Sequence, residues 1–175
     1  MAWINHRQTY QKQEKARSRK ARRNDLEQSI IDGCSVYRRE KKAFIDKVPE
    51  PSQIVKYIGN RKHIVRFGKE ANNLFSGILS DGRMVSFCYA QTDQDRVGED
   101  CVREKMVNRL GVLQENGAAC FIIIGTPYNE YYRIPLWIWQ NAKVKYNGHG
   151  IPKDDICSMK VSMDKGKALL FLAGW

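Results

Sequence analysis

Apolar residues recur at helical spacing from residue 26 onward. Intervals of four, four and three positions place them on one face of a helix, which we expect to pack against the core. These positions are Leu26, Ile30, Cys34 and Tyr37. Asn24, with Glu27 three residues later, matches a capping box, so the pattern predicts that the helix begins at Asn24. Gly33 weakens this helix only slightly.

Runs of β-branched and apolar residues follow this helix. The run 73–92 is divided by Asp81-Gly82, a strong hairpin signal, and predicts two strands joined by a tight turn. Residues 118–126 form a continuous apolar run, which is typical of a strand buried on both faces of a sheet. Further strands are expected in the segments 41–58, 62–68 and 129–143, the last of which continues into a helix.

The segment 98–117 has the pattern of an amphipathic helix that ends at Gly117. Its apolar face consists of Val102, Met106, Leu110 and Leu113. The predicted order is therefore helix, several strands with a hairpin, helix, buried strand, strand and helix. This order predicts an α/β fold with a mixed central sheet flanked by helices.

The first 23 residues have a different composition. Residues 6–23 contain eight Lys or Arg against one acid, Glu14, and their sparse apolar residues show no period. Such a segment cannot bury enough surface to offset the entropy of ordering it. We therefore expect residues 1–23 to form a flexible, disordered basic arm and residues 24–175 to form one folded domain. The net charge of +11 favours a polyanionic partner, usually nucleic acid.

Cysteine and histidine usage gives no sign of a metal site. The five cysteines contain no CxxC pair, and those within apolar runs are expected to be small buried hydrophobes. The three histidines are isolated. The N-terminus has no apolar h-region, and no apolar run approaches the length of a membrane span. These features favour a soluble, cytoplasmic protein in a reducing compartment, with no membrane partner.

An ordered series of short stretches carries a resemblance to a known family. The stretches are LEQSIIDGCSVY (26–37), AFIDKVPEPSQIV (43–55), FSGIL (75–79), DGRMVSF (81–87), GAACFIIIGT (117–126) and KVKYNGHGIPKDDI (143–156). Over about three quarters of its length the chain resembles the RecU-type Holliday-junction resolvases, which belong to the PD-(D/E)xK nuclease superfamily. The resemblance implies a restriction-endonuclease-like fold, a homodimer and binding to branched DNA, in which the family's basic N-terminal arm takes part.

The resemblance also implies where a metal site would lie. The family holds Mg²⁺ with a carboxylate ahead of the hairpin, a Glu-x-Lys on the next strand and a Glu on the first helix. In this chain only the helix Glu remains, as Glu27, which the capping box also explains. The other positions hold Leu74 for the first carboxylate, Ser86 for an acid two residues before the strand Glu, Cys88 for that Glu and Ala90 for the Lys. Leu and Ala lack ligand atoms and Cys suits Mg²⁺ poorly, so we predict no metal and no cofactor.

Relocated acids would change that prediction. The acids near the hairpin in sequence are Glu70, Asp81, Asp93, Asp95, Glu99 and Asp100. Asp81 is explained by the turn, and Glu99 and Asp100 by the first turn of the following helix. Asp93 and Asp95 follow the strand end and could point back into a cleft. Mg²⁺ is the expected cofactor only if such a relocated site exists.

Basic residues along the chain are candidates for phosphate contacts, which bind without sequence preference. They are Lys15, Arg17, Arg19, Lys20, Arg22, Arg23, Arg38, Arg39, Lys41, Lys42, Arg61, Lys62 and Arg83. Arg83 is equally explained as a solvated edge residue. Tyrosines that could stack on bases are Tyr128, Tyr131 and Tyr132. Tyr132, Trp137 and Trp139 are better explained by packing in the core or in a dimer.

Three functional hypotheses remain open from the sequence. The first is a DNA-binding, RecU-like dimer that lacks metal-dependent cleavage. The second is an active junction endonuclease with relocated acidic ligands. The third is a phage or mobile-element protein that inhibits a host nucleic-acid-processing enzyme, as anti-CRISPR proteins do.

Overall fold

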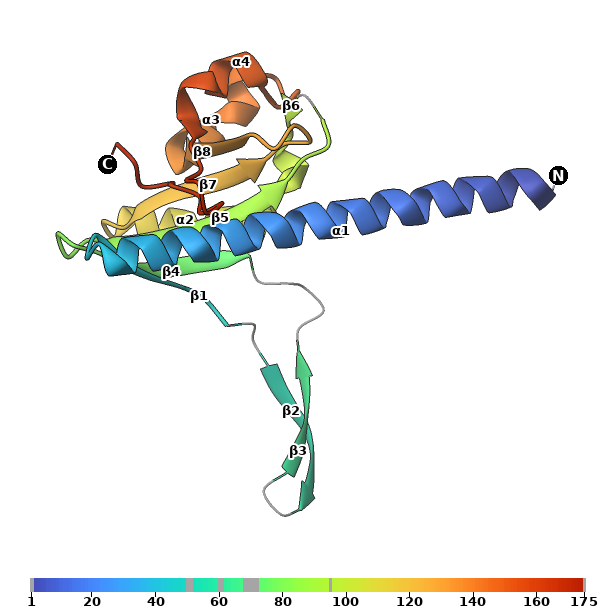
Figure 1. Cartoon of the computed structure of the whole chain (residues 1–175), viewed down its shortest axis with the longest axis horizontal. Helices are drawn as coiled ribbons and strands as arrows, with labels where there is room; N and C mark the ends of the chain where they lie inside the picture. The colour runs from blue at the N-terminus through green and yellow to red at the C-terminus, as the bar shows by residue number, and fades with distance from the viewer. Residues whose placement is uncertain (1, 50–51, 60–61, 68–72, 95, 175) are drawn as a thin grey trace.

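The computed structural model describes residues 2–49, 52–59, 62–67, 73–94 and 96–174. Helix α1 (Ala2–Arg39) runs along a six-stranded sheet and then extends well beyond the body of the protein (Figure 1). The predicted apolar stripe is confirmed, because Leu26 and Ile30 are fully buried and Cys34 and Tyr37 nearly so.

The N-terminal part of α1 differs from the prediction. The helix continues through Asn24, so a helix start at Asn24 is wrong, and residues 2–23 are helical instead of forming a disordered arm. Residues 2–32 contain neither Gly nor Pro and are rich in good helix formers. The packed half of α1 can therefore propagate toward the N-terminus without a new nucleation step. A domain boundary at residue 23 stays a prediction.

The central sheet has the strand order β1-β4-β5-β7-β8-β10. Its strands are β1 (Ala43–Lys47), β4 (Leu74–Leu79), β5 (Met84–Gln91), β7 (Ala119–Gly125), β8 (Tyr131–Pro135) and β10 (Lys160–Val161). β5 and β7 are parallel, whereas the other neighbouring pairs are antiparallel. The sheet is therefore mixed, as predicted. The hairpin at Asp81-Gly82 is confirmed, with Gly82 at a φ of 83°.

Side chains alternate between two cores along β5. Phe87 and Tyr89 point to the face that α1 covers. Cys88 and Ala90 point to the opposite face, which is covered by α2 (Glu104–Glu115) and α3 (Leu136–Lys145). The sheet thus lies between two helical layers, and its two faces carry different chemistry at neighbouring positions.

Smaller elements lie outside this sheet. Strands β2 (Ser52–Gly59) and β3 (Lys62–Phe67) form a separate hairpin that projects away from the body (Figure 1). The remaining elements are β6 (Arg96–Val97), β9 (Ile151–Pro152), α4 (Lys153–Ile156) and 3₁₀ helices at Glu99–Cys101 and Cys157–Met159. Among the described residues, no helix combines the length and the apolar character needed to cross a bilayer.

The C-terminal segment crosses α1 at Gly33. The N–H of Leu169 donates to the carbonyl of Ser29 (2.9 Å), and the N–H of Leu172 donates to the hydroxyl of Tyr37 (2.8 Å). A Cβ at Gly33 would lie 2.2 Å from the Leu169 carbonyl oxygen. Gly33 therefore permits a close approach of two backbones instead of only weakening the helix.

The aromatic residues divide between core and surface. Tyr132 and Trp139 are buried, as expected for core residues. Trp137 is 59% exposed, which contradicts a place in the core of this chain.

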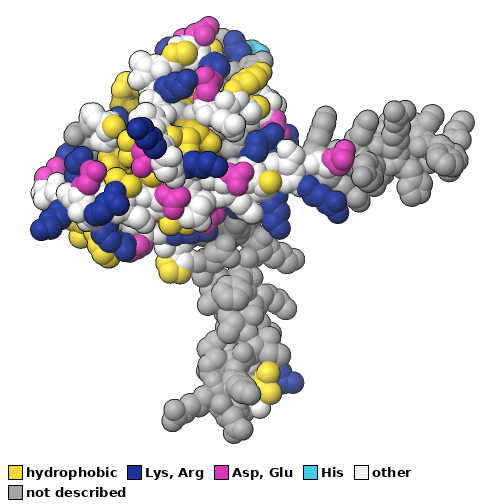
Figure 2. Space-filling model, viewed as in Figure 1, with side chains coloured by type: hydrophobic (Ala, Val, Ile, Leu, Met, Phe, Trp, Pro, Cys, Tyr) yellow, Lys and Arg dark blue, Asp and Glu magenta, His cyan; other side chains and the backbone are white. Residues whose placement is uncertain are grey.

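Cys34, Cys88 and Cys120 are buried free thiols, as predicted. On the face shown in Figure 2, Lys and Arg side chains lie among Asp and Glu over most of the body.

Candidate functional site

A cleft of 780 Å³ opens where α1 passes the end of β5. Three basic residues of α1 line one side, and the residues that end β5 line the other. The lining residues are Arg19, Lys20, Arg23, Asn24, Glu27, Lys47, Asn73, Ala90, Gln91, Thr92, Asp93, Gln94, Asp100 and Cys101. The cleft therefore joins the basic part of α1 to the strand that carries the predicted catalytic positions.

Glu27 has an ion pair and a hydrogen bond inside this cleft. Its carboxylate accepts from the ammonium of Lys47 on β1 and from the hydroxyl of Tyr89 on β5. Partial burial opposes the charge of Glu27, but the bonds from Lys47 and Tyr89 outweigh it and hold its pKa below the ordinary value. A capping role for Glu27 is wrong, because α1 has no end near residue 24.

Asp93 pairs with two arginines from α1. One carboxylate oxygen accepts from Arg19 Nε and the other from Arg22 Nη2. Next to this pair, Arg23 Nη2 donates to Asn73 Oδ1 (2.9 Å), and Asn73 Nδ2 donates to the carbonyl of Tyr89 (3.1 Å). Polar side chains thus fasten α1 to the ends of β4 and β5.

The strand positions that correspond to metal ligands pack on the other face of the sheet, away from Glu27, although Ala90 also borders the cleft. Leu74 and Cys88 are direct cross-strand partners and are 0% and 1% exposed. Ala90 is 5% exposed and belongs to the same apolar cluster. Burial raises the pKa of the Cys88 thiol to about 12, so it stays protonated at neutral pH. Ser86, also buried, lies within hydrogen-bond distance of Ser76 Oγ (2.7 Å) and donates to the carbonyl of Phe75 (3.2 Å).

A second cavity of 240 Å³ reaches Cys88 and shares part of its wall with the cleft. The shared residues are Arg23, Asn73, Asp100 and Cys101. Within the part of the chain that the structure describes, no three His, Cys, Asp or Glu side chains come together as a metal-binding group. The shared wall therefore connects the second cavity to the cleft, but it does not supply a set of carboxylates that could bind a metal ion.

The relocated acids have separate places. Asp81 accepts from the backbone N–H (3.0 Å) and the Nε (2.7 Å) of Arg83, which confirms its role in the turn. Asp93 and Asp100 line the cleft, and Asp93 is neutralised by arginines. Glu99 and Asp100 lie in a 3₁₀ helix that precedes α2 and do not form its first turn. Glu70, Asp95 and the side chain of Glu99 fall outside what the structure describes.

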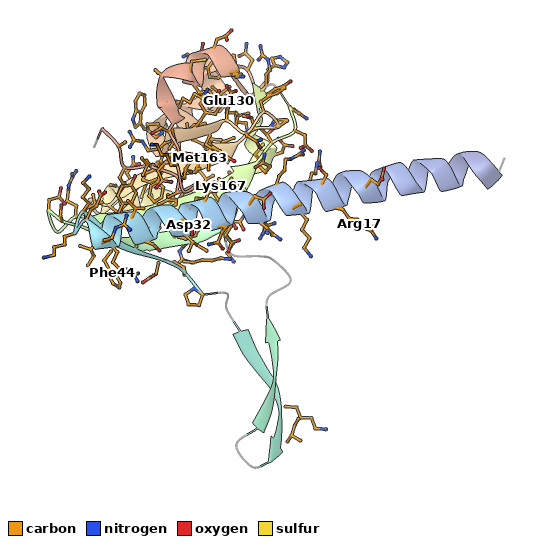
Figure 3. All side chains as sticks on the ribbon, viewed as in Figure 1. Arg17, Asp32, Phe44, Glu130, Met163 and Lys167 are labelled. Atoms are coloured by element: carbon orange, nitrogen blue, oxygen red, sulfur yellow. The ribbon has the colours of Figure 1, made fainter. Side chains whose placement is uncertain are left out.

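The structure brings together some of the predicted DNA-binding residues. Arg19, Lys20 and Arg23 line the cleft, and Arg22 is tied to its wall through Asp93. Arg17 is exposed on the stretch of α1 that extends past the body, whereas Asp32 lies where α1 crosses the sheet (Figure 3). The side chains of Lys15, Arg61 and Lys62 fall outside the described residues.

Basic residues near the C-terminal end of α1 stand apart from the cleft. Arg38 pairs with Asp46 (2.7 Å) and stacks over the Phe44 ring at 4.2 Å, and Lys42 pairs with Glu40 (2.7 Å). Further exposed basic residues here are Arg39 and Lys41. Arg83, at the hairpin turn, is held by Asp81. These residues do not form one surface with Arg19 and Arg23.

Sequence reasoning missed Lys47, Asn73 and Tyr89. Asn73 directly precedes Leu74, and Lys47 pairs in register with Phe75, so both lie beside a position that had been singled out. The pairing of β1 with β4 was needed to find these residues, and a pattern of apolar positions does not show which strands pair.

A comparison with protein-family models places this arrangement in context. The model described as RecU, Recombination protein U, matches residues 21–172 of the 175-residue chain. No match was found among curated proteins. The matched region begins within the basic part of α1 and includes every described residue that lines the cleft apart from Arg19 and Lys20.

Proposed function

The chain belongs to the RecU family, and from this premise we propose that it binds branched or duplex DNA without cleaving it through a metal ion. The observation that carries the proposal is the pairing of Leu74 with Cys88 in an apolar core. A divalent cation such as Mg²⁺ requires oxygen ligands at close to octahedral positions. Leucine, alanine and a protonated thiol do not supply them.

The cleft supports binding without catalysis. Lys47 places an ammonium group against Glu27, the one acid that remains from the family pattern. Arg19 and Arg22 place two guanidinium groups against Asp93. Cations of the protein itself thus already balance these two carboxylates, whereas a metal site presents unbalanced acids to the ion.

The basic residues of α1 supply the attraction for DNA. Arg17, Arg19 and Lys20 are exposed, and the stretch of α1 beyond the body shows dark blue side chains in Figure 2. Each phosphate that a Lys or Arg neutralises releases counterions. Affinity should therefore fall steeply with salt, with a log–log slope near −4.5 if about five phosphates are neutralised.

The test compares binding and cleavage on one substrate. A labelled four-way junction and a duplex of the same length are titrated with the protein in low salt, first with EDTA and then with Mg²⁺ or Mn²⁺. We expect binding in both buffers and intact DNA. Cleavage that requires the metal would reject the loss of catalysis and favour relocated ligands. Absence of binding at low salt would reject the DNA-binding function and favour the inhibitor hypothesis.

A charge-matched pair of variants locates the DNA-binding surface. We expect Arg17→Gln/Lys20→Gln, on exposed positions of α1, to weaken binding and to make the salt slope about 2 less negative. The control Lys105→Gln/Lys143→Gln changes two exposed lysines on α2 and α3 by the same charge. Equal losses in the two variants would mean that only net charge matters and that α1 is not the DNA-binding surface.

We also propose that the protein acts as a homodimer. Phe44, Ile78 and Met84 are cross-strand neighbours on β1, β4 and β5 and are 59%, 58% and 40% exposed. This apolar row begins on the edge strand β1 and crosses β4 to β5, and a second copy of the chain covers it in the dimer that we propose. Sedimentation of the full chain tests this: Phe44→Ser should shift a dimer toward monomer, and an unchanged dimer would exclude this row as the interface.

A further inference from the structure

The pairing of Asp93 with α1 has the geometry of anion recognition. Arg19 and Arg22 are three positions apart on the helix, and Arg23 is four positions from Arg19, so the three side chains leave the same face of α1. Arg19 and Arg22 each bind a different oxygen of the Asp93 carboxylate. Asp93 comes from the loop after β5, and its side chain is 25% exposed. One anionic group is therefore held between two guanidinium groups at the edge of the cleft.

One donor in this arrangement has no acceptor. Arg22 Nε is buried and has no hydrogen-bond partner among the described residues. Both carboxylate oxygens of Asp93 are already engaged by the two arginines. A phosphodiester carries the same charge as a carboxylate but has additional acceptor oxygens, and a buried donor gains free energy when it finds an acceptor.

We propose that Arg19, Arg22 and Arg23 form a binding site for a DNA backbone phosphate and that Asp93 occupies this site in the free protein. The inference rests on the proposed DNA-binding function and adds a specific site and an internal competitor to it. On binding, the phosphate replaces the Asp93 carboxylate between the arginines, and the carboxylate turns toward water. No covalent bond changes.

Two features favour replacement of the Asp93 carboxylate by a phosphate over a permanent ion pair between Asp93 and the arginines. The Arg19 side chain is 66% exposed, so the pair is accessible to a competing anion and is weakened by solvent. The neighbouring Lys20 and Arg23 line the cleft, so the local charge on this part of α1 exceeds what the single Asp93 carboxylate balances. A polyanion therefore meets a site that already has the geometry for an anion.

The experiment removes the internal competitor. Asp93→Asn is compared with the wild-type full chain for binding to a labelled duplex and a labelled four-way junction at about 50 mM salt, where phosphate contacts are strong. We expect Asp93→Asn to bind about three- to tenfold more tightly, the range given by the release of two partly exposed ion pairs. The control Asp25→Asn changes an exposed acid of α1 by the same charge and should alter affinity less than about twofold.

A second background tests whether the gain passes through the arginines. In Arg19→Gln/Arg22→Gln protein, adding Asp93→Asn should give no gain in affinity. Inorganic pyrophosphate should raise the melting temperature of Asp93→Asn protein more than that of the triple variant Arg19→Gln/Arg22→Gln/Asp93→Asn. The melting curves also show that both variants fold. An equal gain in the absence of the arginines, or an equal gain in Asp25→Asn, would overturn the site.

The outcomes separate this inference from the function on which it rests. If wild type and Asp93→Asn bind DNA with the same affinity, the internal competitor is rejected while DNA binding stands. If neither protein binds DNA at low salt, the proposed function and this site are both rejected.

Discussion

Leu74 and Cys88 face each other across β4 and β5, and both are almost completely buried. The adjacent pair Asn73 and Tyr89 exchanges a backbone hydrogen bond (3.2 Å), so Leu74 and Cys88 form the closer, non-hydrogen-bonded type of pair. Carboxylates at these two positions would lie close enough to share a cation. In this chain the same closeness produces an apolar contact.

Restoring the acids should make stability depend on a metal. In Leu74→Asp/Cys88→Glu protein, two carboxylates would be buried side by side, and we expect a loss of several kcal/mol of unfolding free energy in EDTA. Mg²⁺ or Mn²⁺ should recover part of the loss by binding only the folded state. Thermal melts at increasing metal concentration measure this effect.

The matched control is Leu74→Asn/Cys88→Gln, which is also destabilised by buried polar groups but carries no charge to hold a cation. Its melting temperature should not respond to Mg²⁺. A metal response in the wild-type protein would contradict the apolar character assigned to this pair.

The Glu27 carboxylate should give stability that depends on pH. Its pKa in the folded protein is below the unfolded value, so its contribution is complete above the unfolded pKa and is lost as pH falls through the folded pKa. We expect Glu27→Gln to cost about 1–3 kcal/mol at pH 7, because the bonds from Lys47 and Tyr89 weaken. Denaturant unfolding at pH 7 and near pH 3 measures the difference.

As pH falls toward 3, the stabilities of the wild type and Glu27→Gln should approach each other, because Glu27 takes up a proton in the folded protein. Glu115→Gln is the control, because Glu115 is exposed at the end of α2. Its effect should stay within about 0.5 kcal/mol at both pH values. A Glu27→Gln cost that is equally large at low pH would show that the residue acts through packing and not through its charge.

Thiol reactivity should follow burial. Burial raises the pKa of Cys34 and Cys88 to about 12 and that of Cys120 to about 11, whereas Cys157 is exposed. Because the thiolate is the reactive form, we expect Cys157 to react first with Ellman's reagent at pH 8. Peptide mapping by mass spectrometry identifies the site, and Cys157→Ser should remove the fast phase. Fast labelling of Cys88 would mean that this core opens readily.

Gly33 should tolerate no side chain. Gly33→Ala would bring a Cβ against the Leu169 carbonyl oxygen, and the C-terminal segment would have to move. We expect a loss of about 1–3 kcal/mol, the usual cost of overpacking. Gly111→Ala on α2 is the control, since its nearest atom is the flexible Gln140 side chain at 3.2 Å. That change should be neutral or stabilise by up to about 1 kcal/mol, and equal losses at both glycines would contradict the close crossing.

Local patterns predicted the elements that depend on neighbours in sequence. The Asp81-Gly82 turn specified the hairpin, and the apolar stripe of Leu26 and Ile30 specified the face that α1 buries. The N-terminal part of α1 was not predicted to be helical, because the search for an apolar stripe overlooked the helix propensity of the basic residues before Asn24.

The contacts of the cleft could not be predicted in this way. Glu27 meets Lys47 over 20 positions and Tyr89 over 62, and Asp93 meets Arg19 over 74. Each contact depends on where α1 lies along the sheet, which hydrophobic burial determines without regard to these polar groups. Leu74 and Cys88, the strand positions that the resemblance assigned, are cross-strand partners in the structure, but the resemblance carried no information on the charges beside them.

Because α1 is one continuous helix, its length sets a fixed distance between its two ends. At about 1.5 Å per residue, the 38 residues of Ala2–Arg39 span about 57 Å, or about one and a half turns of a DNA duplex. One half of this rod is fixed by Gly33 and the apolar stripe, so the basic half cannot swing without breaking backbone hydrogen bonds. If a duplex lies along the basic half, as we propose, it is held at a set angle to the sheet, and the length of the helix sets how far from the body its phosphates are bound.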